Sequence, residues 1–105
     1  MKLVLSPEAR RDIVEIEDFT EERWGTERAE TYVRELYAAC IRLTEDPDLG
    51  RRRSDVPPPY RVYATGRHLI VYRVGANQTD IEVLNVLHPA MNIASRLCDS
   101  LRYRS

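Results

Sequence analysis

The chain has 105 residues, of which 43% are hydrophobic and 31% charged, and its formal net charge is −1 at pH 7. This balance is typical of one soluble globular domain over residues 1–105 and excludes a disordered chain. Because no run of about 20 apolar residues occurs, and because the N-terminus lacks the apolar core of a secretory signal, we expect a cytoplasmic protein without membrane contact.

The first elements expected along the chain are a short strand over residues 2–5 and a helix that begins after Ser6-Pro7. Serine suits the N-cap position, and proline suits the first helical position. Apolar residues then recur at three- to four-residue spacing as far as Gly25, where the helix should end. The stripe consists of Ala9, Ile13, Ile16, Phe19 or Thr20, and Trp24.

A second amphipathic helix is predicted after Gly25, with Thr26 as its N-cap, and it should stop at Asp46-Pro47. Its apolar stripe consists of Ala29, Tyr32, Val33, Leu36, Cys40 and Leu43. Since a single glycine separates the two helices, they should form a tight hairpin. A basic, proline-rich loop over residues 50–59 follows.

Beyond this loop the period of the pattern changes to two, which indicates strands at residues 60–65, 68–74 and 80–88. Turn residues separate them, so a three-stranded antiparallel meander is expected. Helical spacing returns over residues 92–101. The predicted fold class is therefore α+β: a helical hairpin packed on a small antiparallel sheet, in the order β-α-α-β-β-β, plus a short C-terminal helix.

Both faces of the predicted sheet are apolar. In the last strand, Ile81, Val83 and Leu87 should point one way, and Leu84 and Val86 the other. One helical hairpin covers only one face, and each Leu, Ile or Val left exposed would forgo about 1.5–3 kcal/mol. The second face therefore needs the C-terminal helix, another chain or both, and the sequence leaves these possibilities open.

The charges are unevenly distributed along the chain. Residues 1–49 carry 7 basic and 13 acidic side chains, whereas residues 50–105 carry 9 basic and 4 acidic ones. A basic half can face an acidic partner or nucleic acid. The alternative is that the two layers of the fold attract each other.

Cysteine and histidine are too few and too scattered for a metal centre. Cys40 and Cys98 are the only cysteines and have neither disulfide-framework nor zinc-ligand spacing. We therefore expect no metal and no cofactor.

Five stretches, taken together and in order, resemble the RelE/ParE toxin superfamily, and the first helix is especially similar to the ParE branch. These stretches are residues 5–9, 13–25, 45–51, 66–74 and 86–92, and the resemblance covers roughly residues 3–95. It implies the toxin of a type II toxin–antitoxin pair. It also implies a ParD-like antitoxin whose C-terminal segment wraps the toxin in a hetero-oligomer, such as a heterotetramer. Operator DNA would be contacted only by the antitoxin.

The two branches of this superfamily act differently. ParE members are understood to act on DNA gyrase, whereas RelE members cut messenger RNA in the ribosome. RNA cleavage by the 2′-hydroxyl needs a base, an acid and cations near the phosphate. The candidates for target contact are Arg61, Arg67, Arg73 and His88.

The ribonuclease set is incomplete in this sequence. The arginine that the family usually carries after this histidine is missing, because Pro89-Ala90 stand there, and the single lysine is Lys2. Tyr103 lies near the end of the chain. We therefore expect no catalytic residues and a gyrase-directed toxin that is not an enzyme. A ribosome-dependent ribonuclease and a decayed, non-toxic antitoxin-binding module remain alternatives.

The antitoxin is expected to bury the apolar stripe beside the helical hairpin and the open sheet face. The candidate antitoxin-binding residues are Ile13, Ile16, Tyr32, Leu36, Arg51, Arg52, Leu69, Val71, Leu84 and Val86. Trp24, at the tip of the hairpin, is interpreted as a packing anchor rather than a binding residue. His88, at a strand end, is interpreted as structural rather than catalytic.

Overall fold

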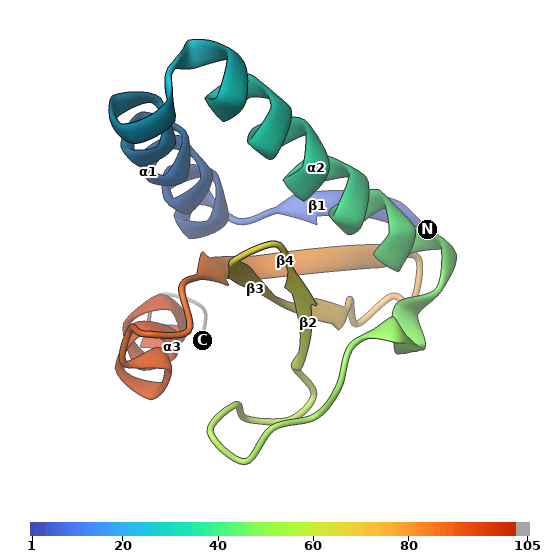
Figure 1. Ribbon diagram of the computed structural model, residues 1–105. Helices are drawn as coiled ribbons and strands as arrows, with labels where there is room; N and C mark the ends of the chain where they lie inside the picture. Colours follow the sequence, from blue (N-terminus) through green and yellow to red (C-terminus); the bar gives the residue numbers. More distant parts are fainter. Residues whose placement is uncertain (103–105) are drawn as a thin grey trace.

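The computed structural model describes residues 1–102, in which a four-stranded sheet lies between a helical hairpin on one side and a short helix with a long loop on the other (Figure 1). The fold class is α+β, as predicted. In chain order the elements are β1 (Lys2–Leu5), α1 (Pro7–Trp24), α2 (Thr26–Glu45), the short 3-10 helix η1 (Pro47–Leu49), β2 (Arg61–Thr65), β3 (His68–Val74), β4 (Asp80–Leu87) and α3 (Ile93–Arg102).

The hairpin begins and turns where the sequence indicates. The Ser6 hydroxyl oxygen accepts the Ala9 N–H at 2.8 Å and so caps α1. At the turn, Gly25 adopts a φ of 90°, a conformation that favours glycine. The prediction that Thr26 caps α2 is wrong: Gly25 occupies the N-cap position, and Thr26 instead donates its hydroxyl to Glu21 Oε1 at 3.2 Å.

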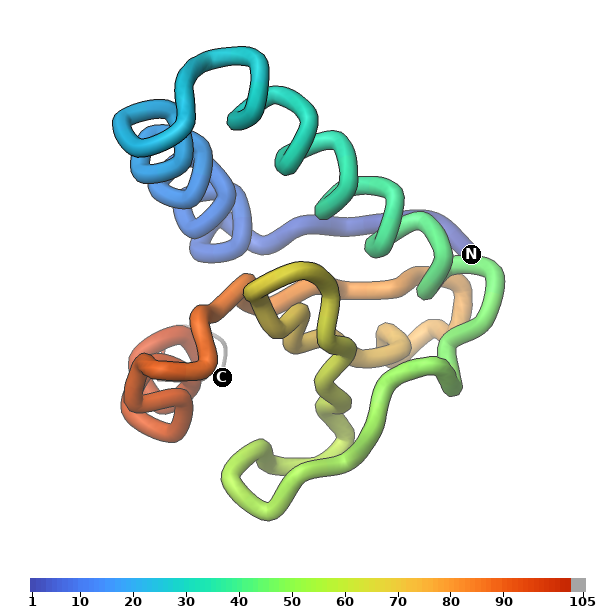
Figure 2. The backbone as a smooth tube through the Cα atoms, in the orientation of Figure 1, coloured from blue at the N-terminus to red at the C-terminus, as the bar shows by residue number. Residues whose placement is uncertain are grey.

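The strand order is β1-β4-β3-β2. The meander pairs antiparallel as predicted, but β1 pairs with β4 in parallel, so the sheet is mixed. Figure 2 shows that the chain enters this strand beside the end of α2, where the Met1 ammonium donates to the Thr44 carbonyl at 3.3 Å. The long hairpin is thus the connection between β1 and the meander.

Because β1 ends at Leu5, opposite Val83, the last part of β4 has no neighbouring strand on that side. Side chains at the start of α1 replace it. The Ser6 hydroxyl donates to the Leu84 carbonyl at 2.6 Å, and Asp12 Oδ2 accepts the Val86 N–H at 2.9 Å. The open edge of β4 is thereby satisfied by α1, and α1 is held against the strand.

A β-bulge alters the faces of β4. Val71 lies opposite Asn85, while the next residue, Tyr72, lies opposite Val83, so Leu84 is an extra residue. Beyond the bulge the alternation of side chains is reversed. Val86 therefore faces the hairpin and Leu87 faces away from it, and the prediction made from strict alternation is wrong for both residues.

Two apolar cores result, one on each face of the sheet. The hairpin covers the first, which includes Ile13, Leu36 and Tyr72. The second lies between the sheet, α3 and the loop before β2, and it includes Val71 and Leu97. Of the alternatives left open by the sequence, the C-terminal helix is thus the element that covers the second face. Among residues 1–102, no helix has the length and apolar character needed to cross a bilayer.

Candidate functional site

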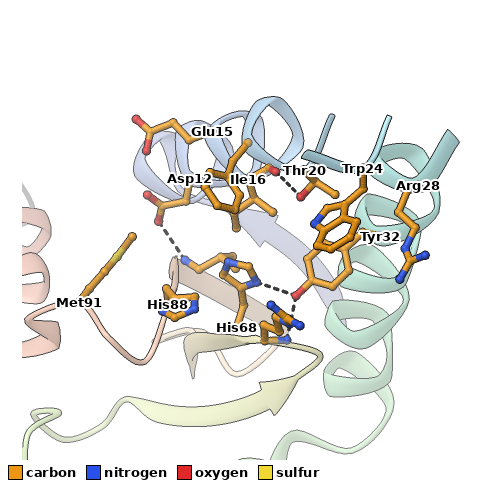
Figure 3. Close-up of a pocket in the computed structure, with 13 residues that line it drawn as sticks. Asp12, Glu15, Ile16, Thr20, Trp24, Arg28, Tyr32, His68, His88 and Met91 are labelled. Carbon is orange, nitrogen blue, oxygen red and sulfur yellow. Dashed lines mark hydrogen bonds between the residues drawn. The ribbon is translucent and has the colours of Figure 1, made fainter. Parts of the chain in front are cut away.

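A cavity of about 620 Å³ lies between the helical hairpin and the adjoining ends of β3 and β4 (Figure 3). Its lining residues come from α1 and α2, from the start of β3 and the turn before it, and from the end of β4 and the segment after it. They are Asp12, Glu15, Ile16, Phe19, Thr20, Trp24, Arg28, Tyr32, Arg67, His68, Val86, His88 and Met91. The tertiary structure therefore collects a mixed apolar and charged surface from four separate parts of the sequence.

One wall of the cavity follows a four-residue repeat on the hairpin. Asp12, Ile16, Thr20 and Trp24 succeed one another at i, i+4 spacing on α1, and such residues share one face of a helix. On α2, Arg28 and Tyr32 have the same spacing. Polar and aromatic side chains therefore border the apolar stripe of the hairpin, and these side chains line the cavity.

Tyr32 joins α2 to the start of β3. Its hydroxyl oxygen accepts the backbone N–H of Arg67 at 3.0 Å and lies 2.6 Å from His68 Nδ1. Since the hydroxyl already accepts one hydrogen bond, its own proton can be donated to Nδ1, which places the proton of a neutral His68 on Nε2. Gly66 makes this approach possible, because a Cβ there would lie 2.7 Å from the tyrosine oxygen.

Two histidines meet in the floor of the cavity. The rings of His68 and His88 lie 5.6 Å apart in an edge-to-face arrangement. Burial, and secondarily the charge of His88, lowers the pKa of His68 from 6.5 to about 4. His68 is therefore neutral at pH 7. His88 Nδ1 accepts the Ala90 N–H at 3.1 Å, which orients that ring from the segment after β4.

Asp12 anchors the opposite end of the cavity. Its Oδ2 accepts the Asn85 side-chain amide and the Val86 backbone N–H, both at 2.9 Å. Burial raises the pKa of Asp12, although these two hydrogen bonds counteract the shift. Asn85 Oδ1 is itself a buried acceptor that lacks a hydrogen-bond partner within the described part of the chain.

The tip of the hairpin presents aromatic side chains to solvent. Phe19 is 56% exposed and Trp24 is 59% exposed. The guanidinium of Arg23 lies 4.9 Å from the Phe19 ring centroid, and that of Arg28 lies 5.7 Å from the Trp24 ring. The interpretation of Trp24 as a packing anchor is therefore wrong, since a side chain this exposed contributes to a surface rather than a core.

The four candidates for target contact are divided between the cavity and two separate places outside it. Arg67 and His88 line the cavity. Arg61 instead donates to the Gly50 carbonyl at 3.2 Å and lies 3.6 Å from Asp48. Arg73 pairs with Glu82 at 2.9 Å and lies over the Tyr60 ring. The structure therefore does not bring the three arginines and the histidine into one site.

The candidate antitoxin-binding residues also fall into separate groups. Ile16, Tyr32 and Val86 line the cavity. Arg51 and Arg52 are exposed, and the Arg51 backbone pairs with Val62 at the edge of β2. The remaining candidates are buried by the chain's own helices, and they are Ile13, Leu36, Leu69, Val71 and Leu84. All five form core in this structure: Ile13 and Leu36 under the hairpin, and the other three on the face that α3 closes.

Several cavity residues escaped the sequence reasoning, notably Asp12, Phe19, Arg28, His68 and Met91. The available signal for Asp12 was its place four residues before Ile16 on the helix face that also carries Trp24. His68 gave no local signal, because its role depends on α2 docking over the β2–β3 turn. Among the described residues no group of three or more His, Cys, Asp or Glu side chains is arranged to hold a metal ion. Tyr103 lies outside the described residues.

The sequence matches the model of one protein family over residues 3–93, described as the ParE toxin of the type II toxin–antitoxin system parDE. Toxin ParE1 of Mycobacterium tuberculosis is 40% identical over 96 residues, covering 91% of this chain and 97% of that toxin. Toxin ParE1 of Caulobacter vibrioides is 38% identical over 93 residues, covering 89% of this chain and 94% of the relative.

Solved structures share the fold. A chain of the chromosomal ParDE toxin–antitoxin system of P. aeruginosa superposes with a TM-score of 0.71 at 21% identity, covering 84% of this chain and 95% of that one. The isolated RelE toxin of E. coli gives a TM-score of 0.57 at 14% identity, covering 95% and 97%. At these identities the likeness concerns the backbone architecture.

Proposed function

Because this chain belongs to the ParE family of type II toxin–antitoxin toxins, we propose that it blocks DNA gyrase and is held inactive by a ParD-like antitoxin. Family membership supports the gyrase target, since the ParE branch is the one whose members are understood to act on that enzyme. Both partners would be met in the cytoplasm. The antitoxin would form a hetero-oligomer with the toxin and would carry all contact with operator DNA.

The observation that carries the antitoxin proposal is the cavity beside the hairpin tip. It is bordered by exposed apolar side chains, among them Phe19 and Trp24. Large aromatic side chains that stay exposed next to a concavity are typical of protein interaction sites. A polypeptide segment seated there would remove both rings from water without disturbing either core.

The distribution of the arginines supports an action by binding rather than by catalysis. Arg61 and Arg73 are held by Gly50, Asp48 and Glu82, outside the cavity. Among the described residues, Arg28 and Arg67 are the arginines that line the cavity with the histidine pair. Both residues are exposed, whereas electrostatic catalysis relies on preorganised charge in a site that excludes water.

The gyrase proposal is tested with purified toxin freed from its antitoxin. We expect it to inhibit supercoiling of relaxed plasmid by gyrase, or to raise gyrase-dependent DNA cleavage. Plasmid relaxation by a type I topoisomerase should be unaffected and provides the control. If supercoiling proceeds normally at a several-fold molar excess of folded toxin, gyrase is not the target.

The antitoxin proposal is tested by co-expression with the product of the neighbouring reading frame. Trp24→Ala should weaken the complex by about tenfold or more, since truncation of an aromatic hot-spot residue costs about 2 kcal/mol or more of binding free energy. Tyr37→Ala, an exposed aromatic on α2 outside the cavity lining, is the matched control. Failure of the wild-type proteins to co-purify would exclude the proposal.

The second candidate function is ribosome-dependent RNA cleavage. One observation favours it: His68, His88, Tyr32 and Arg67 lie together in the cavity, and they include groups able to transfer protons. This candidate predicts cut transcripts in expressing cells, and loss of cutting in His88→Ala without loss of folding. Intact messenger RNA during growth arrest would eliminate it, whereas undisturbed growth would indicate a decayed toxin.

A further inference from the structure

We propose that the cavity admits its antitoxin segment in a single orientation: a carboxylate beside Arg28 and Arg67, a bulky apolar side chain at the centre, and a basic side chain beside Asp12 and Glu15. The inference rests on the proposed function, because it specifies the partner segment that neutralisation requires. It concerns only the order of chemical groups along that segment.

Opposite charges lie at the two ends of the cavity. Asp12 and Glu15 belong to the middle of α1, and Figure 3 shows them on the same side as Met91, while Trp24 and Arg28 lie on the other side. Arg67 also lines the cavity, and its backbone lies at the Arg28 end, because the Arg67 backbone N–H is donated to the hydroxyl of Tyr32, one helical turn beyond Arg28. The cavity therefore has an acidic end and a basic end.

The positive charge at the basic end comes from arginine. His68 is neutral at pH 7, since burial holds its pKa near 4. The two guanidiniums are the fixed positive charges there, and both can bind a carboxylate through paired N–H donors. An acidic side chain of the partner would meet donors at this end, and at the other end it would meet the carboxylates of Asp12 and Glu15, with Arg96 near Asp12.

Apolar side chains lie between the charged ends and beside them. Ile16 forms part of the cavity wall, and Phe19, Trp24 and Met91 expose 56%, 59% and 38% of their surface. Covering such a patch is worth roughly 25 cal/mol per Å² of apolar area removed from water. The affinity would come from the apolar centre, while the two ends would determine the direction of the segment.

The dimensions suit a short piece of polypeptide. From Asp12 to Trp24 the helix advances twelve residues, or about 18 Å at 1.5 Å per residue. About five or six residues of extended chain span the same distance. Both a three-turn helix and a short extended segment can thus reach from one charged end to the other.

The acidic end distinguishes a polypeptide from a nucleic acid. The sugar-phosphate backbone of a nucleic acid carries the same negative charge along its whole length. It would gain at Arg28 and Arg67 but would be repelled at Asp12 and Glu15. A polypeptide can alternate the sign of its charges within a few residues, so it can complement both ends.

The first test measures the affinity of toxin variants for the antitoxin encoded by the neighbouring reading frame. Arg28→Glu and Glu15→Lys should each weaken binding by about tenfold or more, because each places like charges together. Arg34→Glu and Asp18→Lys reverse exposed charges on the same helices outside the cavity lining and should change binding less than threefold.

These measurements distinguish a failure of the proposed function from a failure of the proposed orientation. If the wild-type toxin does not bind the antitoxin, the proposed function fails. If the wild type binds but the two cavity variants bind as tightly as the two control variants, only the orientation is overturned.

The second test identifies the group beside position 28. Lys2 is the only lysine of the chain, so Arg28→Lys introduces an amine against a low background. A carbodiimide that joins amines to carboxylates without a spacer should couple this amine to an Asp or Glu of the antitoxin, as read by peptide mass spectrometry. An intact complex in which position 28 is not coupled to an antitoxin carboxylate would overturn the proposed orientation.

Discussion

His68 links the helical layer to the sheet through a single side-chain contact. Its Nδ1 lies 2.6 Å from the Tyr32 hydroxyl, and its ring lies edge-to-face against His88. A neutral Nδ1 accepts the hydroxyl proton, whereas a protonated Nδ1 would have to donate to a hydroxyl oxygen that already accepts the Arg67 N–H. Protonation of His68 is therefore coupled to the docking of α2 over the β2–β3 turn.

The free energy of unfolding should consequently depend on pH between 6.5 and about 4. The pKa of His68 is near 4 in the folded chain and near 6.5 when the residue is unperturbed. Between these values the unfolded chain binds more protons at His68, so stability falls as the pH is lowered through this window. Urea unfolding of the wild type and His68→Gln at several pH values should show a shallower dependence in the variant.

Asp12 titrates in the opposite sense at acidic pH, since its raised pKa lets the folded chain bind a proton more readily than the unfolded chain. This contribution is present in both proteins and cancels in their difference. Parallel stability curves for wild type and His68→Gln would contradict the role assigned to His68.

At the scale of elements, the start of α1 has two structural roles. Ser6 caps the helix through Ala9, and it also satisfies the Leu84 carbonyl on the unpaired edge of β4. Ser6 is 6% exposed, so water cannot readily replace the second hydrogen bond. One serine therefore stabilises a helix and replaces part of the missing neighbouring strand.

Ser6→Ala should accordingly lower the free energy of unfolding more than the loss of an ordinary capping side chain does. Loss of a capping side chain costs about 1 kcal/mol, and a buried acceptor left unpaired adds about 1–3 kcal/mol. We expect Ser6→Ala to lower the free energy of unfolding by about 2–4 kcal/mol in urea titrations. Asn92→Ala is the matched control, because Asn92 caps α3 through Ser95 at 3.1 Å from an exposed position. Equal losses for the two variants would refute the second role of Ser6.

At the scale of the molecule, the sheet is covered on both faces by one chain. The hairpin covers Ile70 and Val86, whereas α3 and the loop before β2 cover Val71 and Leu84. The core of the isolated toxin therefore does not depend on a second polypeptide. The cavity between the hairpin and the sheet remains accessible at the surface.

Leu97 tests whether α3 closes the second face. It is 2% exposed and packs in the core beneath α3. Leu97→Ala should lower the free energy of unfolding by about 2–5 kcal/mol, as expected for a large buried side chain. Cys98→Ala, at the adjacent exposed position, should leave it nearly unchanged. A loss for Leu97→Ala no greater than that of Cys98→Ala would show that α3 is not docked in solution.

Local patterns in the sequence were sufficient for the strands, the three α-helices and their order, but not for the short 3-10 helix η1. Ser6-Pro7 and Gly25 indicated where α1 begins and ends, and the change of period after residue 59 indicated the meander. Helix caps and apolar periodicity act over a few residues, so they can be read without knowledge of the fold. The same patterns, taken in order, carried the resemblance to the family.

Tertiary contacts determined which face of the sheet each side chain occupies, which candidate residues are buried, and where the cavity lies. The bulge at Leu84 moved Val86 to the hairpin side, and the docking of α3 turned Val71 and Leu84 from a candidate interface into core. The cavity arose only where Asp12 and His68, distant in the chain, were brought to one surface. Strand register and the packing of layers depend on long-range contacts between residues, and the periodicity of a single segment carries no information about them.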